Sequence, residues 1–242
     1  MRPTKSYRDP LFINSNEARA LRILAEYLEP KARLEQQGLE DTIVFFGSAR
    51  VREGSPWYES ARALACRLTA WSKGLDPAHQ RRFVVCTGGG PGIMEAANRG
   101  ASEARGRNVG FAISLPCEEA VNPHVTRELS FHFHYLFMRK FWLAYMAKAM
   151  VVFPGGYGTL DELFEVLTLV QTRRMTKPMP IVLFGTEYWK EVINFDALLR
   201  HGMIEARDVD LVHRSDSVDD AYGWIVGRLA EDALGGPGAT MA

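Results

Sequence analysis

One stretch of the sequence constrains the fold more than any other: residues 149–165, AMVVFPGGYGTLDELFE. Its apolar part, residues 150–153, is short and closed by Pro154, as in strands that are buried on both faces. Three of the next four residues are glycines: Gly155, Gly156 and Gly158. Without Cβ atoms, such a loop lets backbone N–H groups approach a ligand closely. Because a helix N-terminus carries unpaired N–H groups and a positive dipole end, a helix after this loop predicts an anion site.

That helix is predicted by Thr159 and Glu162, which have the spacing of a capping box, and by apolar residues at helical intervals. The apolar residues are Leu160, Leu163, Phe164, Leu167 and Val170. The stretch is not an ATP/GTP P-loop, since no lysine follows the glycines to reach terminal phosphates. A monophosphate is therefore the ligand hypothesis. The alternative is a tight strand-to-helix turn with an ordinary cap.

Length and composition fit one globular domain. We expect a single Rossmann-like nucleotide-binding domain over residues 1–242, with an N-terminal extension (1–40) and a disordered tail (235–242). The chain is 47% hydrophobic and 24% charged, which is ordinary for a soluble protein. Its formal net charge of +0 at pH 7 lacks the basic excess of a general nucleic-acid-binding protein. No apolar run reaches transmembrane length, so no membrane partner is expected.

The cysteines and the N-terminus indicate a cytoplasmic protein. The basic start of the chain leads into no apolar segment that would form a secretory signal. Cys66, Cys86 and Cys117 are widely spaced, odd in number and without a C-x-x-C pair, which fits reduced thiols.

Strands and helices alternate at least four times, the pattern of an α/β fold with a doubly wound parallel sheet. The expected strands are residues 42–46, 83–87, 108–115, 150–153 and 180–184. The expected helices are residues 57–71, a helix from about 93, residues 141–148 and a helix from the glycine loop to about 174, and a polar helix-and-loop region ends near 233. Residues 72–82 are expected to form a polar connection.

Before the first strand, the sequence predicts an added N-terminal helix. Ser15 or Asn16 can cap it, and it continues or restarts after Pro30 toward Gln37. Its apolar face is formed by Ala18, Leu21, Leu24, Ala25 and Leu28. Such a face either packs across the domain or forms a subunit contact. The first 14 residues are expected to be extended.

Three strands each end in a loop of small residues: Gly47-Ser48, residues 87–92 and residues 155–159. In doubly wound sheets ligands bind beyond the carboxyl ends of the strands, so these loops are expected to converge on one ligand. The second loop does not match the dinucleotide motif G-x-G-x-x-G, because Ile93 stands in place of the last glycine. The sequence therefore predicts a site for a nucleotide, and not for a dinucleotide.

Two other features have ordinary explanations. His132 and His134 are two residues apart without a third ligand at a recognisable spacing, so partly buried histidines are favoured over a metal site. Phe141, Trp142 and Tyr145 could stack on a base, but aromatic residues at helical spacing are more often core. We expect neither a metal nor a cofactor.

Three segments, taken together, resemble the motif set of the Lonely Guy (LOG) family. They are residues 88–98 (GGGPGIMEAAN), Arg139-Lys140 and residues 154–162 (PGGYGTLDE). The resemblance covers about residues 41–190 and includes the order and spacing of the segments. LOG proteins are nucleoside 5′-monophosphate phosphoribohydrolases, among them cytokinin-activating enzymes, and were often labelled lysine decarboxylases. Phe137 stands where the plant-type motif has a histidine, which resembles the longer bacterial branch.

The resemblance implies a hydrolase that cleaves the N-glycosidic bond of a purine nucleoside 5′-monophosphate, such as AMP or a cytokinin riboside monophosphate. Arg139 and Glu162 would be catalytic. The substrate-binding residues would be Gly47, Ser48, Thr87, Gly88, Gly89, Gly90, Met138, Arg139, Lys140, Gly155, Gly156, Tyr157, Gly158, Thr159 and Asp161. A homodimer or higher homo-oligomer is also implied.

The proposed roles agree with chemistry. An ionised carboxylate beside the ribose stabilises the positive charge that develops as the N-ribosyl bond breaks, and a place in the first helical turn would help keep Glu162 ionised. Arg139 could hold phosphate or polarise the leaving base. The alternatives are a protein that binds a nucleotide or molybdenum cofactor without turnover, and a pyridoxal-phosphate decarboxylase. The last is disfavoured because no lysine is placed at the glycine loops.

Overall fold

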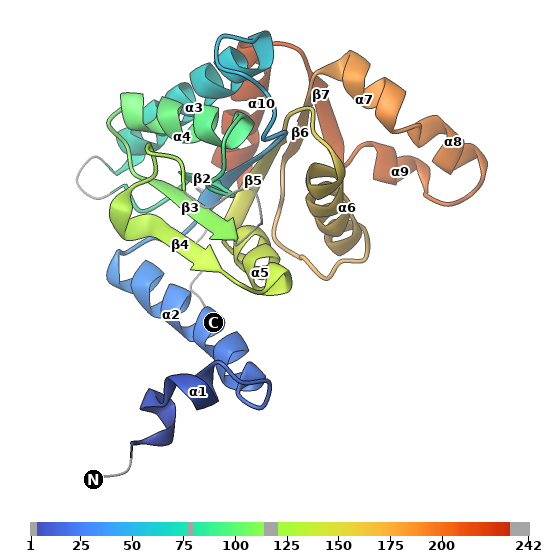
Figure 1. Ribbon diagram of the computed structural model, residues 1–242. Coiled ribbons are helices and arrows are strands. Elements are labelled where there is room, and N and C mark those ends of the chain that lie inside the picture. The colour runs from blue at the N-terminus through green and yellow to red at the C-terminus, as the bar shows by residue number, and fades with distance from the viewer. Residues whose placement is uncertain (1–3, 77–79, 114–120, 233–242) are drawn as a thin grey trace.

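A computed structural model describes residues 4–76, 80–113 and 121–232. Over these residues the chain forms a seven-stranded sheet with strand order β4-β3-β2-β1-β5-β6-β7, and every neighbouring pair is parallel (Figure 1). The strands are β1 (Thr42–Phe46), β2 (Val84–Thr87), β3 (Asn108–Ile113), β4 (Ser130–Phe133), β5 (Ala147–Val152), β6 (Ile181–Phe184) and β7 (Val212–Ser215). The strand order reverses between β1 and β5, so the predicted doubly wound α/β fold is confirmed.

Within the described residues, helices connect most of the successive strands, two helices precede β1, and three lie between β6 and β7. The helices are α1 (Pro10–Ile13), α2 (Arg19–Gln36), α3 (Pro56–Leu75), α4 (Ile93–Glu103), α5 (Leu136–Met146), α6 (Tyr157–Gln171), α7 (Thr186–Val192), α8 (Phe195–Arg200), α9 (Ala206–Val209) and α10 (Val218–Asp232). Two short 3-10 turns, Ser6–Arg8 and Arg127–Leu129, complete the described structure. No helix in the described part of the chain combines the length and the apolar character that a membrane crossing requires.

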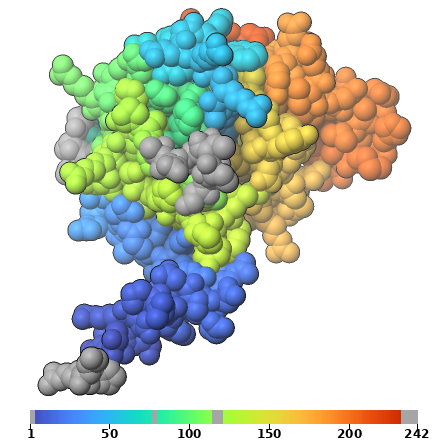
Figure 2. Space-filling view, viewed as in Figure 1, coloured from blue at the N-terminus to red at the C-terminus, as the bar shows by residue number. Residues whose placement is uncertain are grey.

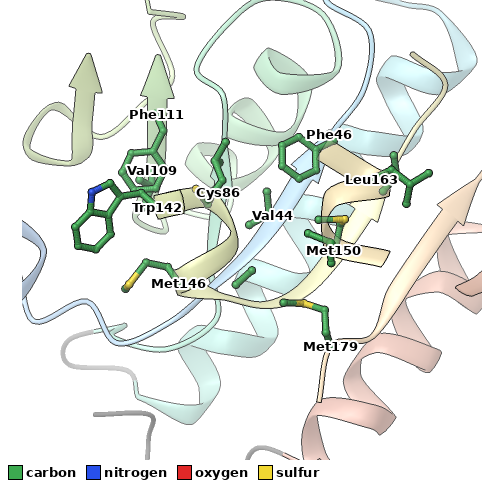
Figure 3. Packing of buried hydrophobic residues seen from close by; sticks show 14 of the residues in the cluster. Val44, Phe46, Cys86, Val109, Phe111, Trp142, Met146, Met150, Leu163 and Met179 are labelled. Carbon is green, nitrogen blue, oxygen red and sulfur yellow. The ribbon is translucent and has the colours of Figure 1, made fainter. Parts of the chain in front are cut away.

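Alternate side chains of the strands pack into two cores, one on each face of the sheet. Ile43 and Phe45 of β1 join α3, α4 and α10 on one face, whereas Val44 and Phe46 join α2, α5 and α6 on the other. Figure 3 shows part of the second core, where Phe46, Met150 and Leu163 lie close together. All five residues of β1 are buried, as expected for a strand covered on both faces.

The N-terminal extension is helical. The predicted helix is confirmed as α2, which continues through Pro30 rather than restarting after it. The predicted cap at Ser15 or Asn16 is wrong, because Ala18 is the N-cap residue and no side chain caps the helix. The expectation that the first 14 residues are extended is wrong, because Ser6–Arg8 forms a 3-10 turn and Asp9 caps α1 through Leu11 N. These short elements project from the body as an arm (Figures 1 and 2).

Two strands escaped the sequence analysis, β4 and β7, which lie at the two edges of the sheet. Edge strands carry polar residues: His132 of β4 is exposed, and His213 and Arg214 of β7 are half-buried. α3 extends to Leu75, so the expected polar connection begins later than predicted. The tail 235–242, Cys117 and the first three residues lie outside the described residues. Of the other cysteines, Cys86 is buried and Cys66 half-buried, and both are free.

Candidate functional site

Three loops meet at the carboxyl ends of β1, β2 and β5, and the backbone of Ser48 joins them. Ser48 N donates to Pro154 O at 2.9 Å, and Ser48 O accepts from Ile93 N at 3.2 Å. Gly47 must lack a Cβ, because a Cβ there would lie 2.7 Å from Ile93 Cγ2. The predicted convergence of the loops after these strands is therefore present at the switch point of the sheet.

The third loop presents a helix N-terminus to open space. Helix α6 begins at Tyr157 with Gly156 as its N-cap residue, and Leu160 N donates to Gly156 O. Added Cβ atoms at Gly156 and Gly158 would meet nothing within 4 Å. Gly155 is different, because a Cβ there would collide with the Thr159 hydroxyl. The N–H groups of the first turn are thus available to an anion.

The capping box predicted for Thr159 and Glu162 is wrong. The helix begins before Thr159, no side chain caps it, and Thr159 is buried within its first turn. Glycine at the N-cap leaves the turn without a side-chain acceptor. Glu162 consequently lies beyond the first turn and has no capping role.

Arg139 and Glu162 face each other beside these loops. The Arg139 Nη1 atom lies 3.4 Å from Glu162 Oε1, and both side chains are largely buried, with 12% and 11% exposed. Arg139 Nε also donates to Phe111 O at 2.7 Å, which fixes the plane of the guanidinium. A Cβ at Gly88 would collide with Arg139 Nη2, so the glycine loop after β2 lies directly against the guanidinium.

Burial raises the pKa of Glu162 to about 7, although the charge of Arg139 lowers it. Asp161 raises the pKa further, Lys140 lowers it, and Glu165 raises it. The expectation that the helix keeps Glu162 ionised is therefore wrong, since desolvation outweighs the neighbouring positive charges. The carboxyl group can exist in either protonation state near neutral pH, as a general acid or base requires.

The sequence is similar to those of known proteins. A family model described as "Possible lysine decarboxylase" matches residues 94–224, more than half of the chain. The chain is 29% identical over 175 residues to the rice protein named "Probable cytokinin riboside 5'-monophosphate phosphoribohydrolase LOGL3", covering 70% of this chain and 75% of that protein. A cytokinin riboside 5'-monophosphate phosphoribohydrolase of the bacterium Rhodococcoides fascians is 32% identical over 72 residues, 30% of this chain and 34% of its own. The chain belongs to the LOG family.

The fold is also similar to solved structures. The molybdenum cofactor carrier protein of Chlamydomonas reinhardtii superposes with a TM-score of 0.55 and 22% identity over 79% of this chain and 99% of its own. The molybdenum cofactor binding protein of Rippkaea orientalis gives a TM-score of 0.54 and 19% identity over 78% of this chain and 96% of its own. At these identities the likeness shows the fold alone.

Lys140 of this LOG family chain lies between two carboxylates. Its Nζ atom is 3.0 Å from Asp161 Oδ2 and 3.0 Å from Glu165 Oε2. Burial lowers the pKa of Lys140, but hydrogen bonds to Asp161 and Glu165 outweigh it and the pKa lies above its usual value. A Schiff base needs an unprotonated amine, so Lys140 does not suit the decarboxylase chemistry in the family model's description.

The loop after β2 is held by a network of buried amides. The Thr87 hydroxyl donates to Asn98 Oδ1 at 2.6 Å and accepts from Gly89 N at 2.9 Å. Asn122 Nδ2 donates to Asn98 Oδ1 and to the carbonyls of Gly89 and Gly90. The Thr87 side chain, a predicted substrate ligand, therefore serves the loop itself.

The remaining predicted site residues lie at this edge with different exposures. Met138 is buried on the inner face of α5, whereas Tyr157 is 93% exposed at the tip of the glycine loop. Three further contributors to the site were not predicted from the sequence: Asn122, the Phe111 carbonyl and Tyr188, whose hydroxyl donates to Gly155 O at 2.6 Å. These contacts join distant segments, and no local pattern signals them.

The structure also shows the surroundings of the two histidines and of the aromatic residues in α5. His132 and His134 are exposed, so the expectation of partly buried histidines is wrong. Over residues 4–76, 80–113 and 121–232, no group of three or more His, Cys, Asp or Glu side chains could hold a metal ion. Trp142 is buried in the core, while Phe141 and Tyr145 stack on each other with ring centroids 5.1 Å apart.

A groove of about 580 Å³ lies between α5 and α6, lined in part by Phe137, Phe141, Tyr145 and Glu165. Neither Arg139 nor Glu162 lines it. We place the candidate site at the glycine loops because the buried ion pair and the open helix N-terminus meet there. The groove offers mainly apolar surface.

Proposed function

We propose that this protein hydrolyses the N-glycosidic bond of a purine nucleoside 5′-monophosphate, with AMP as the first candidate. Water adds to C1′ of the ribose while the bond to the base nitrogen breaks and the base takes up a proton. The products are free base and ribose 5-phosphate. The names of the LOG relatives support this reaction class.

The observation that carries the proposal is the buried pair of Arg139 and Glu162 beside an open helix N-terminus. The N–H groups at Gly156–Thr159 would hold the 5′-phosphate, since anions bind where a dipole end and unpaired donors coincide. Lys140, already neutralised by two carboxylates, would add little to phosphate binding. The ribose would then lie between the glycine loop and the pair.

Glu162 would act on C1′. As a carboxylate it would stabilise the oxocarbenium-like transition state or accept a proton from the attacking water. The guanidinium of Arg139 would hold the carboxylate in place while facing the leaving base or the phosphate. A site with these groups needs no lysine nucleophile.

The test is incubation of the purified protein with AMP and chromatography of the products. We expect adenine and ribose 5-phosphate in equal amounts, and turnover slower on the order of 100-fold or more in the Glu162→Gln variant. Parallel reactions with GMP, CMP and a cytokinin riboside monophosphate would identify the preferred base. If none of the four nucleotides is hydrolysed during prolonged incubation at high protein concentration, the result would favour the alternative function, a protein that binds a ligand without turnover.

A further inference from the structure

Helix α2, from the N-terminal extension, contacts the start of α5 through one carboxylate. Glu26 Oε1 accepts from His134 N at 2.8 Å, and Glu26 Oε2 accepts from Tyr135 N at 3.1 Å. Both N–H groups belong to the residues immediately before α5. A single side chain 108 positions earlier in the chain thus binds the entry to the helix that carries Arg139.

Nothing in α5 can replace this contact. Its N-cap residue, Tyr135, makes no side-chain cap, and its first turn contains no acidic residue. Orphan N–H groups and the positive end of the helix dipole favour a carboxylate at this place. Glu26 therefore supplies, from another helix, the carboxylate that the entry to α5 lacks locally.

The same residue makes a second contact with α5. The carbonyl oxygen of Glu26 accepts from the indole N–H of Trp142 at 3.0 Å. Tyr27 stacks on the Trp142 ring, with centroids 5.7 Å apart and planes inclined by 26°. Helix α5 is thereby held to α2 at its entry and again along its length.

A short path of contacts connects Glu26 to the candidate active site. Tyr135 N donates to Glu26, and Tyr135 O accepts from Arg139 N at 3.2 Å. The guanidinium of Arg139 in turn lies against Glu162. A shift of Tyr135 at the start of α5 would move Arg139 directly, because the two residues are one helical turn apart.

We propose that Glu26 is a positioning residue for Arg139: its carboxylate holds the start of α5 and so sets where the guanidinium lies against Glu162. The proposal deepens the proposed function and rests on it for any measurement of turnover. It assigns a task to an extension that lies outside residues 94–224, the part of the chain that the family model matches.

The decisive measurement is the titration of Glu162 itself, followed by the ¹³C chemical shift of its carboxyl carbon and assigned by its loss in Glu162→Gln. The charged groups facing Glu162 are Arg139, Asp161, Lys140 and Glu165. In Glu26→Gln, Arg139 loses its fixed place, and we expect the titration midpoint to rise by at least about half a pH unit. Simple removal of a negative charge would have the opposite sign, since it would lower the midpoint.

The matched control is Glu35→Gln, which removes the same charge from the same helix at an exposed position whose carboxylate lies 3.9 Å from Lys31 Nζ. It should leave the midpoint unchanged. Glu26→Asp keeps the charge but is one methylene too short to reach both N–H groups. It should give a smaller upward shift, and it serves if Glu26→Gln fails to fold.

Turnover provides the second arm. With AMP, Glu26→Gln should lower kcat/KM on the order of 10-fold, mainly through kcat, because small displacements of catalytic groups are costly. An unchanged or lowered midpoint in both Glu26 variants would overturn the proposal, as would an equal shift in Glu35→Gln. A parent protein without turnover would instead contradict the proposed function, while the titration would still test the positioning.

Discussion

Among single residues, Glu162 has the most unusual environment, because its burial disfavours the charged carboxylate. Burial raises its pKa from 4.5 to about 7, so the folded state favours the protonated form. The stability that this preference contributes is present at low pH and is lost as the pH rises from about 4.5 through about 7. Neutral glutamine has no such dependence. The melting temperature of Glu162→Gln relative to the parent should therefore rise between about pH 5 and about pH 8 in calorimetry.

The same substitution separates structure from chemistry. Glutamine keeps the shape of the side chain but cannot supply negative charge, so Glu162→Gln should lower the hydrolysis rate on the order of 100-fold or more. Arg139→Ala should show a similar loss. A variant that still hydrolyses AMP within about threefold, or roughly 0.7 kcal/mol of barrier, would move the catalytic role to Asp161 or Glu95.

The sequence predicted which residues carry charge at the site but not how they are surrounded. Glycines before an amphipathic helix predicted a loop that leads into a helix N-terminus, and the structure has this loop before α6. The protonation of Glu162 could not be predicted, because its burial depends on α5 and on the Phe111 carbonyl of β3, which orients Arg139. The prediction of a capping box was wrong for a local reason. Gly156 is the N-cap residue, so the helix begins earlier than the polar pattern suggests.

At the level of elements, apolar strands were predicted from their own residues because both faces of the inner sheet are covered. The edge strands β4 and β7 were missed, since one or more of their side chains meet solvent. Buried amides also escaped prediction. Asn98 belongs to a recognised motif, but its bonds to Asn108 and Asn122 depend on segments that only the fold brings together.

The amide network makes the β2 loop sensitive to a single change. Asn98→Ala would leave Thr87 and Asn122 without their shared acceptor in a fully buried place. We expect the free energy of unfolding to fall by about 2–4 kcal/mol in urea denaturation, because each unsatisfied buried group costs about 1–3 kcal/mol. Exposed Asn16→Ala is the control and should change stability by less than about 0.5 kcal/mol. Equal effects in the two variants would refute the importance of the network.

At the scale of the whole molecule, α2 and α5 leave an apolar surface uncovered, which we define by Leu21, Leu24, Leu28, Phe137 and Phe141. Leu21, Leu24 and Leu28 are 48%, 51% and 51% exposed. Contiguous apolar surface of this kind marks an interface, and we propose that it joins two copies of the chain.

Light scattering at micromolar concentration should therefore give at least a dimer. Leu24→Glu should shift the mass to that of a monomer, because a charge cannot be buried in an apolar contact without a partner. Met203→Glu, a change at an exposed methionine on another part of the molecule, should leave the mass unchanged. A monomeric parent protein would contradict this assembly.

The central strand of the sheet is also the first to be synthesised. Ile43 of β1 pairs with Val85 on one side and with Ala149 on the other, so a nascent chain that ends before β5 carries an open strand edge in its core. Open apolar edges bind other chains readily, which makes this stage of translation the one most exposed to aggregation. Ser48 likewise finds the carbonyl of Pro154 only after β5 has left the ribosome. The pairing of β5 with β1 therefore closes the core of the sheet and also brings the ligand loops together. A translation product that ends before β5 has no complete site.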